Sequence, residues 1–119
     1  MEYGVEEGTT LEEAKVTARL AQEAGANAIH VSAYGPKAPQ NLTLPTPVSG
    51  VLADLAQGIK EAVKVPVIIV GRITPEAGER ILAEGKADLV SIGKGLLADP
   101  EIPNKVATGH VAYIKPCIL

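Results

Sequence analysis

The fold class is decided by residues 65–94, which read VPVIIVGRITPEAGERILAEGKADLVSIGK. Residues 67–70 form an aliphatic, strand-like run, and the preceding Pro66 is compatible with the first position of a strand. A second strand-like run, DLVSI, covers residues 88–92, and each run is followed by a glycine and a cation: Gly71-Arg72 and Gly93-Lys94. Two such runs joined by a helical segment predict a parallel β-α-β unit.

Helix signals separate these runs and also precede them. Thr74 can cap a helix whose first turn contains Pro75, and Gly85 can end it. Residues 10–13 have the spacing of a capping box, and the helix that they start is predicted to stop at Gly25. The sequence therefore alternates helices with short aliphatic segments, as α/β proteins do.

The remaining segments complete the pattern. Residues 28–32 predict another strand, residues 33–50 a long proline-rich loop of the kind that often has a functional role, and residues 52–62 a helix. Continuous apolar strands are typical of a sheet that is buried on both faces. Right-handed crossovers would place Ser32, Arg72 and Lys94 at one edge of this sheet, where ligands bind in parallel α/β folds.

Composition limits the function classes. The 119 residues predict a single domain, 1–119, with 46% hydrophobic and 21% charged residues. A net charge of −3 provides no basic field for nucleic acid or an anionic membrane, and no apolar run is long enough to span a bilayer. With a single cysteine and no signal-peptide pattern at the amino terminus, we predict a cytoplasmic protein.

The strand-end cations have two interpretations. In the first, Arg72 binds a phosphate through a forked pair of hydrogen bonds, Lys94 adds a second charge, and Gly71 and Gly93 let backbone amides approach the ligand. A helix beginning near residue 95 would point its amino end at the same phosphate. In the second, Arg72 forms a structural ion pair with Glu76 and Lys94 is simply solvated. The occurrence of Gly-Arg and Gly-Lys at two successive strand ends favours phosphate.

Several motifs together resemble one family. VGRI at 70–73, ADLVSIGKGLLADP at 87–100 and IKPCI at 114–118 closely resemble the last third of the old yellow enzyme family, in its bacterial NADH:flavin oxidoreductase and 2,4-dienoyl-CoA reductase branch. The resemblance extends over nearly the whole chain, from VEEGTTLEEA at 5–14 through AIHVSA at 28–33 to Cys117. It implies a β/α barrel that carries FMN.

The resemblance also implies which part of the barrel is present. Since such a barrel needs about 250 residues, the three predicted strands correspond to strands six to eight of a partial TIM barrel. The FMN phosphate of the family matches Arg72, Gly93 and Lys94 here, although the family usually has arginine at the last position. Lysine keeps the charge but loses the planar fork.

The implied activity is that of an FMN-dependent NAD(P)H oxidoreductase that reduces activated alkenes, such as enones or enoyl thioesters. The family's catalytic and flavin-ring residues come from earlier strands, so no catalytic residue is assigned and the isolated chain is expected to be inactive. One alternative is a noncatalytic oligomeric α/β module, since open sheet edges predict a homo-oligomer. Another is part of a different barrel that binds a sugar phosphate or nucleotide.

Four further residues carry expectations. His30 lies in an apolar strand and is predicted to be a packed or hydrogen-bonded core histidine, with a catalytic role as the less favoured alternative. Tyr34 is predicted either to cover the core or to lie near flavin or substrate. His110 is predicted to be solvated. Cys117 resembles the first iron–sulfur ligand of the reductase branch, but a single cysteine leads us to expect a free thiol and no cluster.

Overall fold

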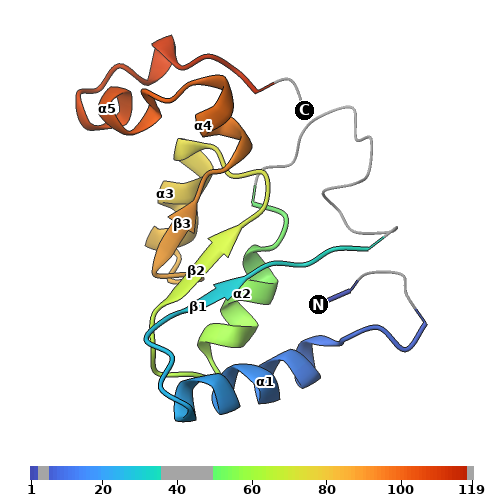
Figure 1. The fold of residues 1–119 in the computed structure, drawn as a ribbon. Helices are drawn as coiled ribbons and strands as arrows, with labels where there is room; N and C mark the ends of the chain where they lie inside the picture. The colour runs from blue at the N-terminus through green and yellow to red at the C-terminus, as the bar shows by residue number, and fades with distance from the viewer. Residues whose placement is uncertain (3–5, 36–49, 118–119) are drawn as a thin grey trace.

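The computed structural model describes residues 1–2, 6–35 and 50–117. Its centre is a parallel sheet in the order β1 (Ile29–Val31), β2 (Val67–Val70) and β3 (Leu89–Ser91) (Figure 1). The bounds of β2 agree with the prediction, and the other two strands are shorter by one residue at each end. The predicted parallel α/β sheet with three strands is therefore confirmed.

The described residues form five α-helices and one 3-10 helix besides the sheet. They are α1 (Leu11–Glu23), α2 (Ala53–Lys60), α3 (Pro75–Ala83), α4 (Lys94–Ala98), α5 (Ile102–Ala107) and η2 (Val111–Tyr113). The capping box predicted for α1 forms, because Glu13 N–H donates to Thr10 Oγ1 and Thr10 N–H donates to the Glu13 carboxylate. Residues 36–49 of the predicted loop lie outside the described part of the chain.

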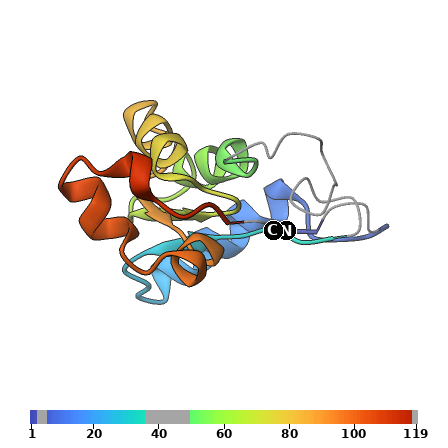
Figure 2. The same ribbon diagram turned by 90° about the horizontal axis from the view of Figure 1, so that it is seen from above.

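Helices cover one face of the sheet. Figure 2 shows α2 and α3 on the same side of the strands, where Val31, Val67 and Ile69 pack with Ile59 and Ile81 in an aliphatic core. This core is built without phenylalanine or tryptophan, as the composition requires. Burial of these aliphatic side chains is the main favourable contribution to folding.

The opposite face of the sheet is not covered by any helix or strand of the described residues. His30, Ile68 and Leu89 alternate with the core residues along their strands, and Leu89 is 50% exposed. The prediction that both faces are buried is therefore wrong for this chain. A barrel still explains why these strands are apolar on both faces, because this face would lie inside a closed barrel. The described residues supply only three strands, so the barrel is not closed by them.

A carboxylate fixes the beginning of the sheet. One oxygen of Asp88 lies 2.8 Å from Lys60 Nζ on α2, and the other accepts a hydrogen bond of 2.9 Å from the backbone N–H of Val67. These contacts hold the pKa of Asp88 below its ordinary value, with the Lys60 hydrogen bond as the largest cause. Asp88 directly precedes β3, so its side chain connects the start of β3 to α2 and to β2.

Across residues 1–2, 6–35 and 50–117, no helix has the length and apolarity needed to cross a membrane.

Candidate functional site at the carboxyl edge of the sheet

Two glycine-cation pairs leave the same edge of the sheet. Val70 and Ser91 are register partners at the ends of β2 and β3, and these parallel strands run in the same direction. Gly71-Arg72 therefore follows one strand end, and Gly93-Lys94 follows its neighbour. Since β1 is also parallel and ends just before Ser32, the predicted meeting of Ser32, Arg72 and Lys94 at one edge agrees with the observed topology.

The first pair forms a constrained turn. Gly71 has φ of 129° and Arg72 has φ of 46°, so a residue with a side chain occupies the left-handed region immediately after β2. That conformation costs roughly 1–2 kcal/mol for an L-residue. The carbonyl of Arg72 accepts a hydrogen bond of 3.1 Å from Gly50 N–H, which helps to hold the turn. The Arg72 side chain is half-buried.

Backbone conformation and packing explain why residue 71 is a glycine, and the sequence did not reveal this reason. A Cβ atom at this position would lie 3.0 Å from Leu52 Cδ1, and Leu52 is fully buried. Together with its positive φ, this contact excludes larger residues. Close approach of a ligand, which was the reason predicted from sequence, is therefore not needed to explain this glycine.

Gly93 has a different environment. Other residues can adopt its backbone conformation, with φ of −83° and ψ of −75°, and a Cβ atom there would lie within 4 Å of no described residue other than its chain neighbours. Gly93 caps α4, and its carbonyl accepts a hydrogen bond of 3.1 Å from Leu96 N–H. Neither backbone strain nor packing requires a glycine at position 93. The open space beside the Gly93 backbone is therefore the feature that fits a ligand.

The charges at this edge were predicted to bind phosphate or to form ion pairs. Lys94 is exposed and makes no ion pair with any residue that the structure describes. The ion pairs among those residues also include none between Arg72 and Glu76, which was the alternative predicted from sequence. The phosphate interpretation of the four residues Gly71, Arg72, Gly93 and Lys94 stays a prediction.

A buried carboxylate next to this edge organises the carboxyl-terminal segment. Asp99, which is 3% exposed, lies 2.5 Å from Lys105 Nζ and accepts backbone hydrogen bonds from Lys115 at 2.9 Å and Glu101 at 3.1 Å. The Lys105 hydrogen bond, followed by the one from Lys115, lowers the pKa of Asp99 to about 2, although burial opposes the shift. Lys105 Nζ also donates to the carbonyl of Tyr113 at 2.9 Å.

Sequence reasoning did not single out Asp99. A local signal exists, because an aspartate followed by proline and glutamate can accept a hydrogen bond from the backbone two residues later, as Asp99 does from Glu101. The contact with Lys115 spans 16 residues and has no comparable signal. Asp99 therefore fixes the segment that leads to Cys117.

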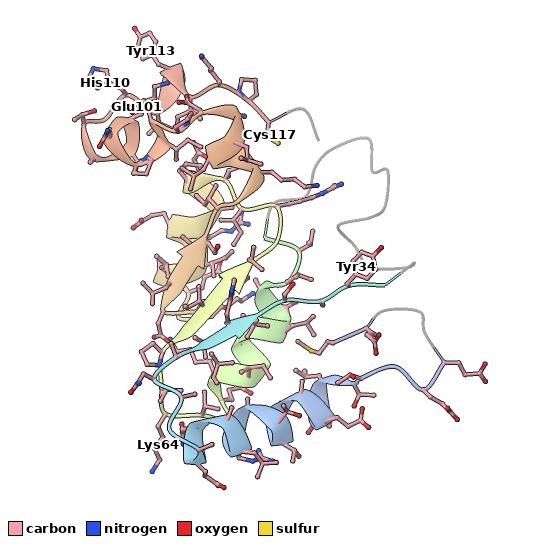
Figure 3. All side chains as sticks on the ribbon, in the orientation of Figure 1. Tyr34, Lys64, Glu101, His110, Tyr113 and Cys117 are labelled. Carbon is pink, nitrogen blue, oxygen red and sulfur yellow. The ribbon has the colours of Figure 1, made fainter. Side chains whose placement is uncertain are left out.

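Four candidates remain, of which Figure 3 labels Tyr34, His110 and Cys117. His30 is exposed, so the prediction of a core histidine is wrong: its position on β1 turns it to the face opposite the core residue Val31. Tyr34 is 72% exposed and does not cover the core. His110 is exposed as predicted, with Nδ1 2.9 Å from Thr108 Oγ1 and its ring 6.1 Å from that of Tyr113.

Cys117 was predicted to be a free thiol that holds no iron–sulfur cluster. Cys117 is a free, exposed cysteine, and Figure 3 shows it on the side of the molecule toward which the strands run. Within the described residues, no group of three or more histidine, cysteine, aspartate or glutamate side chains is placed to hold a metal ion. The expectation that the chain carries no iron–sulfur cluster stays a prediction.

The parallel sheet, its helix-covered outer face and its charged carboxyl edge define a segment of a β/α-barrel protein. A family model described as the NADH:flavin oxidoreductase / NADH oxidase family matches residues 4–112. The chain belongs to this family, and the predicted resemblance to the old yellow enzyme family is confirmed. A flavin is the cofactor that the family implies.

Curated relatives support the same assignment. The chain is 46% identical over 116 residues to an NADH oxidase of Thermoanaerobacter brockii, covering 96% of this chain and 18% of that protein. It is 46% identical over 109 residues to a metal reductase of Desulforamulus reducens, covering 89% and 16% respectively. A bilirubin reductase of Mediterraneibacter gnavus is 34% identical over 116 residues, covering 94% and 18%. The chain therefore spans less than a fifth of the length of these relatives.

A solved structure supports the fold. Histamine dehydrogenase from Rhizobium sp. 4-9 superimposes with a TM-score of 0.62 at 23% identity, covering 87% of this chain and 14% of that one. This agreement concerns the fold alone, and it confirms the prediction of a partial TIM barrel.

Proposed function

We propose that this chain is the carboxyl-terminal part of an FMN-dependent NAD(P)H oxidoreductase and supplies the site for the FMN phosphate. The observation that carries the proposal is the pair of glycine-cation turns at neighbouring strand ends, with open space in front of the Gly93 backbone. Arg72 and Lys94 would provide the positive charges, and the backbone of Gly93 would provide close access. In β/α barrels, phosphates commonly bind after strands seven and eight.

The geometry fits a phosphate for physical reasons. Arg72 can form two parallel charge-assisted hydrogen bonds, whereas Lys94 acts as a compact, mobile charge. The left-handed turn at Arg72 is locally unfavourable, and unfavourable backbone conformations that are held by their surroundings occur often at ligand sites. When bound, flavin would supply the hydride chemistry, and the role of these residues would be to hold and orient its phosphate.

A titration that compares two flavins tests this assignment. With backbone amide signals followed by NMR, FMN should shift those of Gly71, Arg72, Gly93 and Lys94, whereas riboflavin, which lacks the phosphate, should not. Arg72→Ala should weaken FMN binding by ~1.5–3 kcal/mol, the usual scale for hydrogen bonds to charged groups. Equal shifts with both flavins, or no shift with either, would contradict the proposal.

Arg80 offers a matched control. It lies in the last turn of α3, a helix that starts beside the carboxyl edge of the sheet and runs away from it, and it is exposed with Glu84 at 4.0 Å. Arg80→Ala removes the same charge and should leave FMN binding unchanged. If ribose 5-phosphate competes as well as FMN, the site would instead belong to a barrel that binds sugar phosphates.

The parent activity would be the reduction of activated alkenes by NAD(P)H, as the family resemblance implies. The chain spans less than a fifth of its relatives, and the resemblance assigns the substrate and flavin-ring residues to earlier strands. Enone reduction by the isolated chain with NADPH and added FMN is therefore expected to stay at background. Enone reduction by the isolated chain that is abolished by Arg72→Ala would contradict this expectation.

The expected absence of an iron–sulfur cluster at Cys117 is tested separately by iron and sulfide analysis. Stoichiometric iron with acid-labile sulfide would contradict it.

A second candidate function is that of a noncatalytic homo-oligomer. It is favoured by the uncovered sheet face, where Ile68 is only half-buried and Leu89 is 50% exposed. Covering these side chains in a second copy would remove apolar surface from water. Light scattering at micromolar concentration should then show at least a dimer, Leu89→Asp should shift it toward the monomer, and a compact monomer of the unaltered chain would exclude this function.

A further inference from the structure

The start of α2 contacts the strained turn after β2 at two points. Gly50 N–H donates to the Arg72 carbonyl at 3.1 Å, although the two residues are far apart in the sequence. Leu52, which is 1% exposed, packs so closely on Gly71 that a Cβ atom at position 71 would lie 3.0 Å from its Cδ1. Figure 1 shows the segment before α2 beside the loop that leads from β2 to α3. The turn that carries Arg72 is therefore held by a distant part of the chain.

Gly50 is itself fixed in place. Its carbonyl accepts a hydrogen bond of 3.0 Å from the N–H of Ala53, the first residue of α2. Its φ is 74°, and a Cβ atom at position 50 would lie 2.7 Å from Cδ1 of Ile81, a buried residue of α3. A side chain at this position would therefore displace either the backbone or the packed Ile81 side chain. The Gly50 N–H is thus held at a defined place relative to α2 and α3.

The chain after Arg72 is held as well. Ile73 is 7% exposed and belongs to the aliphatic core, and the Thr74 side chain caps α3. Arg72 lies between these contacts and the one with Gly50, and its φ is 46°. An L-residue keeps this left-handed conformation only where its surroundings enforce it. Because the backbone conformation of a residue sets the direction of its side chain, these contacts determine where the Arg72 guanidinium can reach.

We propose that Gly50 is a positioning residue for the phosphate site: its N–H keeps Arg72 in the left-handed turn from which the guanidinium reaches the FMN phosphate. This inference rests on the proposed function, in which Arg72 binds that phosphate. Gly50 is assigned no contact with the ligand and acts through the Arg72 carbonyl. Binding groups need such a supporting contact, because a small displacement of the group weakens its hydrogen bonds to the ligand.

The hydrogen bond between Gly50 and Arg72 can be followed directly in the unaltered chain. If FMN binds only the left-handed turn, FMN must in return stabilise this hydrogen bond. At a free FMN concentration of about ten times Kd, hydrogen exchange at the Gly50 amide should therefore slow about tenfold more than at the Gly85 amide. Gly85 is a suitable reference because its N–H donates to the Leu82 carbonyl at 3.0 Å beyond the end of α3, away from the carboxyl edge. A glycine with a structural role alone would not show this difference.

A pair of variants compares two glycines of similar backbone conformation. Gly50→Ala adds a Cβ atom 2.7 Å from Ile81 Cδ1, whereas Gly85→Ala, at φ of 70°, adds one that lies within 4 Å of no described residue other than its chain neighbours. Both carry the cost of alanine in the left-handed region. In samples whose amide spectra show a folded chain, Gly50→Ala should weaken FMN binding roughly tenfold, and Gly85→Ala should leave it unchanged. Adding Ile81→Val, which removes Cδ1, to Gly50→Ala should restore most of the lost affinity.

The outcomes separate this inference from the proposed function. If FMN binds the unaltered chain but slows exchange equally at Gly50 and Gly85, or if Gly50→Ala binds FMN as tightly as Gly85→Ala does, Gly50 does not position Arg72 and the proposed function is unaffected. If FMN leaves the amide signals of the unaltered chain unchanged, the proposed function is wrong and this inference fails with it. The exchange measurement uses the unaltered chain, so it decides the inference even if Gly50→Ala does not fold.

Discussion

Asp99 accepts a 2.9 Å hydrogen bond from the backbone N–H of Lys115, so a buried carboxylate holds the segment that ends near Cys117. The same carboxylate binds Lys105 Nζ, and Lys105 in turn donates to the Tyr113 carbonyl. These contacts attach the residues after α5 to the loop that precedes it. The Asp99 carboxylate and Lys105 thus help to fix where residues 113–115 lie.

The first prediction concerns this attachment. Asp99→Asn keeps the size of the side chain but removes the charge that Lys105 and two backbone donors require, so it should lower the midpoint of thermal unfolding and speed hydrogen exchange at the Lys115 amide. The control is Asp54→Asn, because Asp54 also pairs with a lysine, Lys86 at 3.0 Å, but has a 90% exposed side chain. The control should change unfolding only slightly. Similar effects of both substitutions would show that burial of Asp99 contributes nothing.

The second prediction follows from the pKa of Asp99. Its folded pKa of about 2 lies below its ordinary value of 3.8, so the folded state binds this proton more weakly than the unfolded state does. The resulting stabilisation is complete above the ordinary pKa and is lost as pH falls through the folded pKa. Thermal unfolding measured between pH 5 and about pH 2 should therefore show a smaller loss of stability in Asp99→Asn than in the unaltered chain.

Asp88 and Glu13 also contribute to the loss of stability in acid. Their pKa values are also lowered, for Asp88 mainly by Lys60 and for Glu13 mainly by the backbone of Thr10, so the unaltered chain loses stability in acid from several groups. The difference between the two proteins isolates Asp99. Parallel acid profiles for the two proteins would contradict its assigned role.

The third prediction compares neighbouring isoleucines on opposite faces of β2. Ile69 is 0% exposed in the aliphatic core, so Ile69→Ala should lower the free energy of unfolding by about 2–5 kcal/mol. Ile68 lies on the uncovered face and is half-buried, so Ile68→Ala should cost clearly less. Denaturant unfolding of the two variants measures the difference. Equal losses would mean that the second face is covered in solution, as in the proposed homo-oligomer.

Local signals in the sequence predicted much of the fold. The bounds of β2 follow from Pro66 before four aliphatic residues and a glycine after them, and Thr74 accepts a 3.3 Å hydrogen bond from Ala77 N–H as the predicted cap of α3. The parallel order follows from alternating helices and strands. These features depend on residues close together in the chain, which is why the sequence alone reveals them.

The uncovered face could not be predicted in the same way. The apolar character of Ile68 and Leu89 suits a closed barrel interior, but sequence does not reveal whether the covering strands are present. The prediction for His30 was wrong for the same reason, because His30 lies on the same face of the sheet as Ile68 and Leu89. Asp99 has a local signal only for its contact with Glu101, whereas its contact with Lys115, 16 residues away, has no sequence pattern that reveals it.

The last prediction separates the two glycines at the carboxyl edge. Gly71→Ala should lower the free energy of unfolding by roughly 1–3 kcal/mol, because φ of 129° is unfavourable for alanine and its Cβ would lie 3.0 Å from Leu52 Cδ1. Gly93→Ala should change stability little, because its φ of −83° suits alanine and no described residue other than its chain neighbours lies within 4 Å of the new Cβ. If the open space at Gly93 receives the FMN phosphate, the added methyl group should instead weaken binding of FMN. Denaturant unfolding and FMN titration of both variants check this, and a Gly93→Ala protein that binds FMN as tightly as the unaltered chain would remove Gly93 from the proposed site.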